Sequence, residues 1–162
     1  MKIYIGTDHT GFELKEKLKA YLSVLGLGYE VIDKGAFELN TEDDYPDFVT
    51  PVAEEVAKDK ESFGIILGGT GQGEAMCANK TKGVRALVFY GEKLPIDKVD
   101  IKGDESNDSF EIIKLAREHN DANIISISTR FVTEDEAKFA IELFLKTKFS
   151  EEERHIRRIN KF

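Results

Sequence analysis

The sequence predicts an α/β protein with a Rossmann-like, doubly wound sheet of five parallel strands in a three-layer α/β/α arrangement. Two observations carry this prediction. Short apolar runs alternate along the chain with longer segments whose apolar residues recur at helical spacing, a pattern typical of parallel sheets covered by helices. The short runs are also apolar almost throughout, as strands buried on both faces are. We therefore expect one domain over residues 1–162.

Five short apolar runs are predicted to form the strands. In chain order they are Lys2–Gly6, Tyr29–Asp33, Phe63–Leu67, Arg85–Phe89 and Asn123–Ile127. In open parallel sheets, ligands bind beyond the carboxyl ends of the strands. We therefore expect the turns after the first, third and fourth strands to share one rim.

Helices are predicted between and after the strands. Gly26 and Gly28 should end the first of them. Capping boxes at Thr133–Glu136 and Ser150–Glu153 predict one helix that reaches Lys146 and a final helix from about residue 150. The other helices are expected near Leu14, Phe48, Gly73 and Phe110.

Composition excludes several classes of function. The chain is 41% hydrophobic and 33% charged and lacks an apolar run of 18 residues, so we expect a soluble protein that spans no membrane. It enters a strand at once, without the apolar region of a signal peptide, and its one cysteine, Cys77, excludes an internal disulfide. These features favour the cytoplasm. The net charge of −8 argues against nucleic acid as a partner.

A glycine-rich turn follows the third strand. Four glycines lie within six positions, from Gly68 to Gly73, and a run of helix formers comes next. A strand, glycine turn and helix in this order aim backbone N–H groups at one point, where a phosphate or an oxyanion can bind. A P-loop would need Lys and Ser/Thr after Gly73, and a dinucleotide fingerprint would need glycine at position 74. The residue there is Glu74, which excludes both motifs.

Glu74 has two interpretations. Beside a ring of amide donors, a carboxylate could take a proton from carbon while the amides stabilise the resulting oxyanion. Alternatively, Glu74 is a favourable first-turn residue that interacts with the helix dipole. The loop by itself leaves both open.

The three histidines and their neighbours are further candidates. His9 follows Asp8 at the first strand's turn, His119 lies near the end of a predicted helix, and Arg154 and Arg158 could share a helix face and clamp one phosphate. Taken singly, His119 could merely interact with a helix dipole, and the arginines could form a solvated face.

An insertion from about residue 90 to residue 109 is longer than most connections in a compact domain. It follows a strand, so it should emerge on the ligand side, either as a partly ordered flap or as a solvated loop. Its apolar part, Lys93–Ile101, is expected to pack on the body or on a partner subunit near the site, and Gly103–Ser109 to be mobile.

The chain resembles a known family, that of the type B ribose-5-phosphate isomerases. This family also contains the galactose-6-phosphate isomerase subunits. The matching segments keep the family's order and cover nearly the whole chain apart from the insertion. They read GTDHTGFELK, DDYP, GIILGGTGQGEAMCANK, GVRA, LAREHNDAN, STR and RHIRRI.

The resemblance implies a role for each matching residue. Glu74 would be the catalytic base, with Thr70 in the adjoining anion hole, and His119 would be the acid that opens the sugar ring. The substrate-binding positions that it implies are Asp8, His9, Tyr45, Gly69, Gly71, Gln72, Gly73, Asn120, Arg130, Arg154 and Arg158.

One departure from the family pattern decides between two branches. Many members use a cysteine base at the position that Gly68 occupies here, whereas another branch uses a Glu directly after the glycine loop. The chain looks like the second branch, which makes Cys77 a bystander. The implied reaction interconverts ribose 5-phosphate and ribulose 5-phosphate, within the pentose phosphate pathway, and needs no metal or organic cofactor.

Family members are dimers or tetramers with shared sites, so we expect at least a homodimer, in which the partner supplies His119, Asn120 and Arg130. Two alternatives stay open at this point. The substrate could be another sugar phosphate with six or four carbons, such as allose or galactose 6-phosphate or a tetrose phosphate. The chain could also be a non-catalytic sugar-phosphate-binding protein, although such a protein has no use for an acid and a base.

Overall fold

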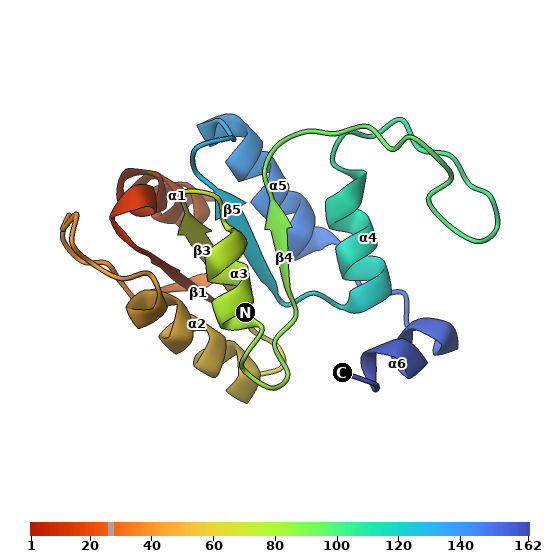
Figure 1. The fold of residues 1–162 in the computed structure, drawn as a ribbon, viewed down its shortest axis with the longest axis horizontal. Coiled ribbons are helices and arrows are strands. Elements are labelled where there is room, and N and C mark those ends of the chain that lie inside the picture. Colours follow the sequence, from red (N-terminus) through yellow and green to blue (C-terminus); the bar gives the residue numbers. More distant parts are fainter. Residues whose placement is uncertain (26–27) are drawn as a thin grey trace.

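The structure is a computed structural model that describes residues 1–25 and 28–162 (Figure 1). Its five strands form one sheet in the order β2-β1-β3-β5-β4, and every neighbouring pair runs parallel. The predicted α/β fold is therefore confirmed. The strands are β1 (Lys2–Thr7), β2 (Glu30–Asp33), β3 (Phe63–Gly68), β4 (Ala86–Phe89) and β5 (Ile124–Ser128).

Helices cover both faces of the sheet. α1, α4 and α5 pack on one face, and α2 and α3 on the other. No helix in the described ranges is long and apolar enough to cross a membrane. The helices are α1 (Phe12–Val24), α2 (Pro46–Lys58), α3 (Gln72–Ala78), α4 (Glu111–Asn120), α5 (Glu134–Lys146) and α6 (Glu153–Ile159), and a 3-10 turn, η1 (His9–Gly11), precedes α1.

The two predicted capping boxes have different outcomes. The first is confirmed, because the Thr133 hydroxyl accepts from the Glu136 N–H and the Glu136 carboxylate accepts from the Thr133 N–H. The second is wrong. Glu151 has a φ of 56°, so the chain turns there, and α6 begins only at Glu153 without a side-chain cap. Of the glycines expected to end the first helix, Gly26 lies outside the described residues, and Gly28 lies beyond the helix end at Val24.

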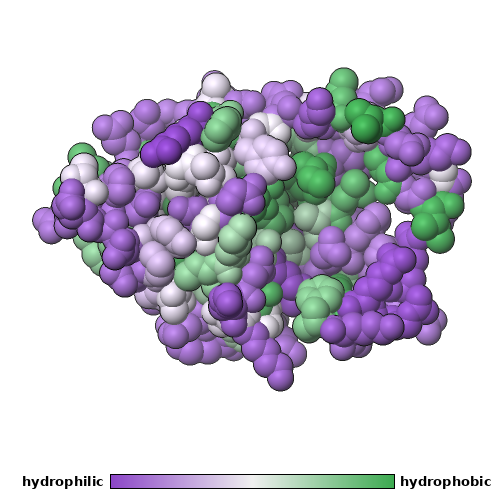
Figure 2. Space-filling view, in the orientation of Figure 1, coloured by the Kyte–Doolittle hydropathy of each residue, from purple (hydrophilic) through white to green (hydrophobic). Residues whose placement is uncertain are grey.

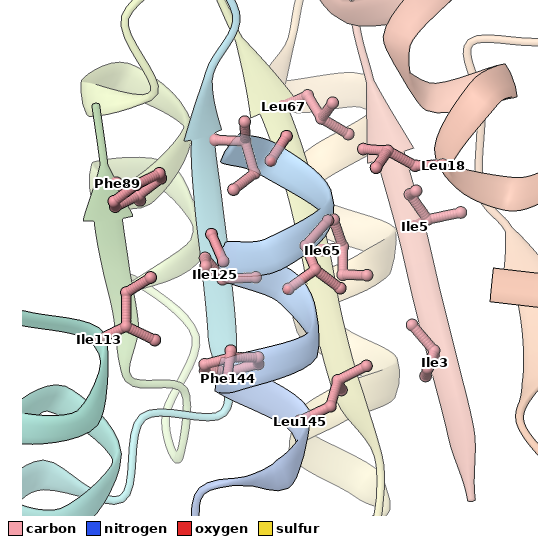
Figure 3. Packing of buried hydrophobic residues seen from close by; sticks show 14 of the residues in the cluster. Ile3, Ile5, Leu18, Ile65, Leu67, Phe89, Ile113, Ile125, Phe144 and Leu145 are labelled. Carbon is pink, nitrogen blue, oxygen red and sulfur yellow. The ribbon is translucent and has the colours of Figure 1, made fainter. Parts of the chain in front are cut away.

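The larger core fills the space between the sheet and α1, α4 and α5 (Figure 3). Its strand residues, which include Ile5, Ile65 and Ile125, have no exposed surface. The facing helices contribute Leu18, Ile113 and Phe144, which are equally buried. This packing makes the sheet a rigid base for the turns at its edge.

The insertion after β4 is closed at its base and exposed at its tip. The Lys93 N–H donates to the Ser109 carbonyl at 2.8 Å, which ties the two ends together. Ile96 is 96% exposed and Ile101 is 79% exposed. The expected packing on the body of the same chain is therefore not found for these two side chains, while packing on a partner subunit and mobility of Gly103–Ser109 stay predictions.

One ion pair joins Lys15 of α1, whose side chain is fully buried, to Asp33 at the end of β2, whose side chain is 16% exposed. Lys15 has no exposed surface, and its ammonium lies 2.8 Å from both carboxylate oxygens of Asp33 and 2.5 Å from the Ala36 carbonyl. Burial alone would raise the pKa of Asp33, but the hydrogen bonds from Lys15 and Lys19 outweigh it and hold the pKa below its usual value. The pair anchors the start of the segment that leads to α2.

We predict that Asp33→Asn lowers the free energy of unfolding by about 3 kcal/mol or more, because the buried Lys15 charge loses the carboxylate that accepts its hydrogen bonds. Glu16→Gln is the matched control, since the exposed Glu16 carboxylate lies 3.4 Å from the same ammonium, and it should cost less than about 1 kcal/mol. Urea denaturation measures both. Because the folded pKa of Asp33 is lowered, the advantage of the wild type should be present at neutral pH and shrink below about pH 4. Equal losses for the two variants would contradict this assignment.

Candidate active site

The glycine loop between β3 and α3 is held by its carbonyl groups. The Gly68 carbonyl accepts from the Thr129 N–H at 2.9 Å, and the Gly69 carbonyl accepts from the Arg130 N–H at 3.2 Å. The buried hydroxyl of Ser126 donates to the Gly71 carbonyl at 2.7 Å. β5 and the turn after it thus fix the loop from behind. Gly71 has a φ of 71°, a left-handed conformation that suits glycine.

Glu74 lies in the first turn of α3 with only 5% of its surface exposed. Burial raises the pKa of its carboxyl, and the negative charge of Asp8 raises it further. Its place depends on the missing side chain at position 68, because a Cβ on Gly68 would lie 1.9 Å from Glu74 Oε1. The carboxylate therefore occupies the volume in which a residue-68 side chain would otherwise sit.

Four other predicted site residues lie around this loop. Asp8 caps η1, where its Oδ1 accepts from the Thr10 N–H at 2.9 Å. The Arg130 guanidinium lies against Gly69 and the Tyr45 hydroxyl against Gly73, since a Cβ on either glycine would approach them to about 3.1 and 3.0 Å respectively. His9 is close enough to Asp8 and Arg130 for both charges to act on its pKa. Asp8, His9, Tyr45, Glu74 and Arg130 thus surround the carboxyl end of β3.

Sequence reasoning missed one residue here, Asp43. Its Oδ1 lies 2.6 Å from His9 Nδ1 and also accepts from the His9 N–H at 3.1 Å. Asp8, His9 and Asp43 have polar atoms within 4.8 Å of one another, a spacing that could hold a metal ion. However, Asp8 Oδ1 and Asp43 Oδ1 each already accept two hydrogen bonds. We therefore interpret His9 and Asp43 as a hydrogen-bonded pair, with Asp8 beside them and bonded to Thr10.

The remaining predicted residues lie elsewhere. His119 and Asn120 end α4, and the Asn120 carbonyl accepts from Arg85 Nε, next to the start of β4, at 2.9 Å. This is the amino edge of the sheet, because α4 runs opposite to the strands (Figure 1). The His119 ring stacks on the buried His155 ring, with centroids 4.2 Å apart. α6 carries His155 together with Arg154 and Arg158.

The structure also gives the state of His155. Arg154 Nε donates to His155 Nε2 at 3.1 Å and also lies 2.7 Å from Glu152 Oε2. Burial lowers the pKa of His155, and the nearby His119 and Arg154 lower it further. A neutral ring therefore supports one face of His119.

The predicted site residues of a single chain thus form two groups, at opposite edges of the sheet. Gly68 lies at the end of β3 that is next to Glu74. Gly64, four residues earlier in β3, pairs with Ile124, and Ile124 in turn pairs with Ala86, the first residue of β4. The two edges are therefore separated by about 13 Å along the strands. The expected grouping of Arg130 with His119 and Asn120 is wrong. Arg130 follows a strand, so it lies at the carboxyl edge with Glu74, whereas His119 ends a helix.

A family profile described as Ribose/Galactose Isomerase matches residues 3–94 and 107–162. The chain belongs to this family. Residues 95–106, within the insertion, lie between the matched segments. The ribose-5-phosphate isomerase B of Mycolicibacterium paratuberculosis is 39% identical over 160 residues, which cover 99% of this chain and 88% of that protein.

Solved structures agree with this membership. The ribose-5-phosphate isomerase B of Mycoplasma genitalium, with ribulose 5-phosphate bound, has a TM-score of 0.83 and 36% identity, and covers 99% of this chain and 92% of that one. The type B enzyme of Trypanosoma cruzi has a TM-score of 0.83 and 34% identity, with 99% and 95% covered.

We predict that Gly68→Ala destabilises this family member by roughly 1–3 kcal/mol, because the new methyl group overlaps the Glu74 carboxylate. Glu74→Ala should relieve the overlap, so Gly68→Ala in that background should cost less than about 0.5 kcal/mol. A double-mutant cycle in thermal or urea unfolding measures this coupling. Equal costs in the two backgrounds would show that the side chains at positions 68 and 74 do not compete for space.

Proposed function

We propose that the protein is a cofactor-independent aldose-ketose isomerase that interconverts ribose 5-phosphate and ribulose 5-phosphate. The observation that carries this proposal is the buried Glu74 carboxyl beside an anchored glycine loop, in a chain whose relatives are named ribose-5-phosphate isomerase B. The Mycoplasma genitalium relative, similar over nearly its full length, binds ribulose 5-phosphate.

The proposed reaction moves one proton within the substrate. Glu74 removes the proton from C2 of the open-chain aldose, and the C–H electron pair forms the double bond of an enediolate. Glu74, now protonated, returns the proton to C1, while the O2 hydroxyl proton moves to O1 and the C2 carbonyl forms, which gives the ketose. Burial raises the pKa of Glu74, which brings the carboxyl closer to the pH at which a base works best. Cys77 packs instead against the cluster between α2 and the sheet, with its Sγ 3.6 Å from Thr50 Oγ1.

The glycine loop would stabilise the enediolate oxygen. β5 and the turn after it bond to the carbonyls of Gly68, Gly69 and Gly71. The loop N–H groups, of which that of Gln72 also donates to Thr70 Oγ1 at 3.3 Å, would bind the anion. We assign this role to the stretch from Gly69 to Gly73, which includes Thr70 and Gln72. Asp8, His9, Tyr45 and Arg130 would bind the substrate around it.

A second copy of the chain would complete the site, with its His119 opening the sugar ring, its Asn120 on the substrate, and its Arg154 and Arg158 holding the phosphate. Phosphate binding then helps to hold the reacting carbons in place. The partly exposed face of the edge strand β4 favours this arrangement. Edge strand β4 is only half-buried over Ala86, Leu87 and Val88, although strands of parallel sheets are normally covered on both faces.

This face is apolar and hollowed. Figure 2 shows apolar side chains gathered around β4 between α3 and α4. A groove of about 520 Å³ runs there, lined by Val84, Leu87, Ala116, Asn120 and Phe162 among others. The groove reaches the His119 end of α4, so a second copy seated on β4 would lie beside His119 and Asn120. We therefore propose at least a homodimer.

Another sugar phosphate stays an alternative substrate, because an insertion that the family profile does not match adjoins the carboxyl edge. A panel of four-, five- and six-carbon aldose phosphates, followed by NMR, would rank the substrates. A non-catalytic binder is disfavoured by the burial of Glu74, since an acid with a raised pKa has no purpose in simple binding of an anion.

We predict that the wild type exchanges the C2 proton of ribose 5-phosphate with D₂O and that Glu74→Gln lowers kcat by roughly 10²–10⁴-fold, the usual effect of losing a positioned base. Proton NMR follows the exchange. Cys77→Ala, three residues further along α3, is the control and should keep near-normal turnover. Absence of both C2 exchange and conversion to ribulose 5-phosphate with the wild type would exclude this isomerase, and loss of turnover in Cys77→Ala alone would reassign the base.

A further inference from the structure

Asp43 is a buried carboxylate next to the proposed substrate. Its side chain is 8% exposed, and its Oδ1 takes both hydrogen bonds from His9, one from the ring and one from the backbone. Its other oxygen, Oδ2, is buried without a hydrogen-bond partner in the described residues. A carboxylate with an unpaired buried oxygen is costly to hold. Within the part of the chain that the structure describes, the Asp43 carboxylate is hydrogen-bonded to His9 alone, which points to a purpose at that ring.

The hydrogen bond between Asp43 and the His9 ring determines which ring nitrogen of His9 faces the site. The carboxylate oxygen can only accept, so His9 Nδ1 carries the proton and Nε2 is turned away from Asp43. The His9 side chain is 29% exposed, so its outer edge can meet a ligand. The backbone bond from His9 to the same oxygen fixes the carboxylate as well as the ring.

The charges around His9 decide its protonation. Its pKa is raised, first by the hydrogen bond to Asp43 and then by the charges of Asp8 and Asp43, against burial and the positive charge of Arg130. Protonated His9 has an N–H at Nε2 to offer, whereas neutral His9 with its proton on Nδ1 has none there. An anion beside Arg130 would therefore meet two cations.

We propose that Asp43 is a positioning residue that holds His9 as a cation, with Nε2–H directed at the negatively charged group of a sugar phosphate. The proposal rests on the isomerase function above and adds Asp43 to its machinery. Asp43 reaches the site from the segment that Lys15 and Asp33 anchor, and Tyr45, two residues later, reaches the glycine loop.

The test compares three variants. Asp43→Asn keeps the side chain's size and removes its charge, and His9→Asn removes the ring. Asp44→Asn, at the exposed neighbouring carboxylate, is the matched control. Ring ¹⁵N NMR of the protein without substrate gives the protonation of His9 directly, and steady-state kinetics with ribose 5-phosphate between about pH 5.5 and pH 9 gives kcat and KM.

We expect Asp43→Asn to lower the pKa of His9, so that the rise in KM on deprotonation begins at lower pH than in the wild type. Near pH 7.5, KM should increase roughly 10-fold or more, as for a lost hydrogen bond to a charged group, while kcat changes less. The double variant Asp43→Asn/His9→Asn, made in addition to the three single variants, should be no worse than His9→Asn alone, because Asp43 acts through His9. Asp44→Asn should match the wild type.

Two outcomes would overturn the proposal. One is an unchanged pKa of His9 in Asp43→Asn. The other is a lowered pKa with an unchanged dependence of KM on pH. Neither outcome touches the proposed reaction, which C2 exchange by the wild type tests separately. If Asp43→Asn is poorly folded, the histidine titration of the wild type still decides, since a pKa of His9 at or below its ordinary value contradicts the proposal.

Discussion

The parallel direction of all five strands is the constraint on which the site depends. Every strand ends at one edge of the sheet and every covering helix ends at the other. The turns after β1, β3 and β5 therefore meet, which brings Asp8, Glu74 and Arg130 together. The same rule sends the end of α4, with His119, to the opposite edge. A mechanism that needs both sets of groups then calls for two copies of the chain.

Within the carboxyl edge, close packing determines the chemistry. β5 and the turn after it hold the glycine loop by its carbonyls, and the space beside Gly68 is filled by the Glu74 carboxylate. Burial raises the pKa of that carboxyl. Any side chain at position 68 would need the volume that the Glu74 carboxylate fills here.

Much of this could be predicted from the sequence, because it is encoded locally. The five strands, the Thr133 capping box and the position of Glu74 after a glycine turn each depend on residues close together in the chain. The Ser150 capping box failed because Glu151 adopts a positive φ, which the local pattern does not reveal. Asp43 was missed because its partner, His9, is 34 positions away. The grouping of Arg130 was wrong because a family likeness assigns roles to residues but does not say at which edge of the sheet each residue lies.

The central claim is that Glu74 and His119 act in one site, although within one chain they lie at opposite edges of the sheet. Subunit complementation tests it most directly. Glu74→Gln and His119→Ala are each purified as nearly inactive proteins, then mixed, dissociated and reassembled. Shared sites predict that mixed dimers regain one intact site, with about one quarter of wild-type activity after random assortment. A mixture that stays as inactive as its two components would contradict the claim.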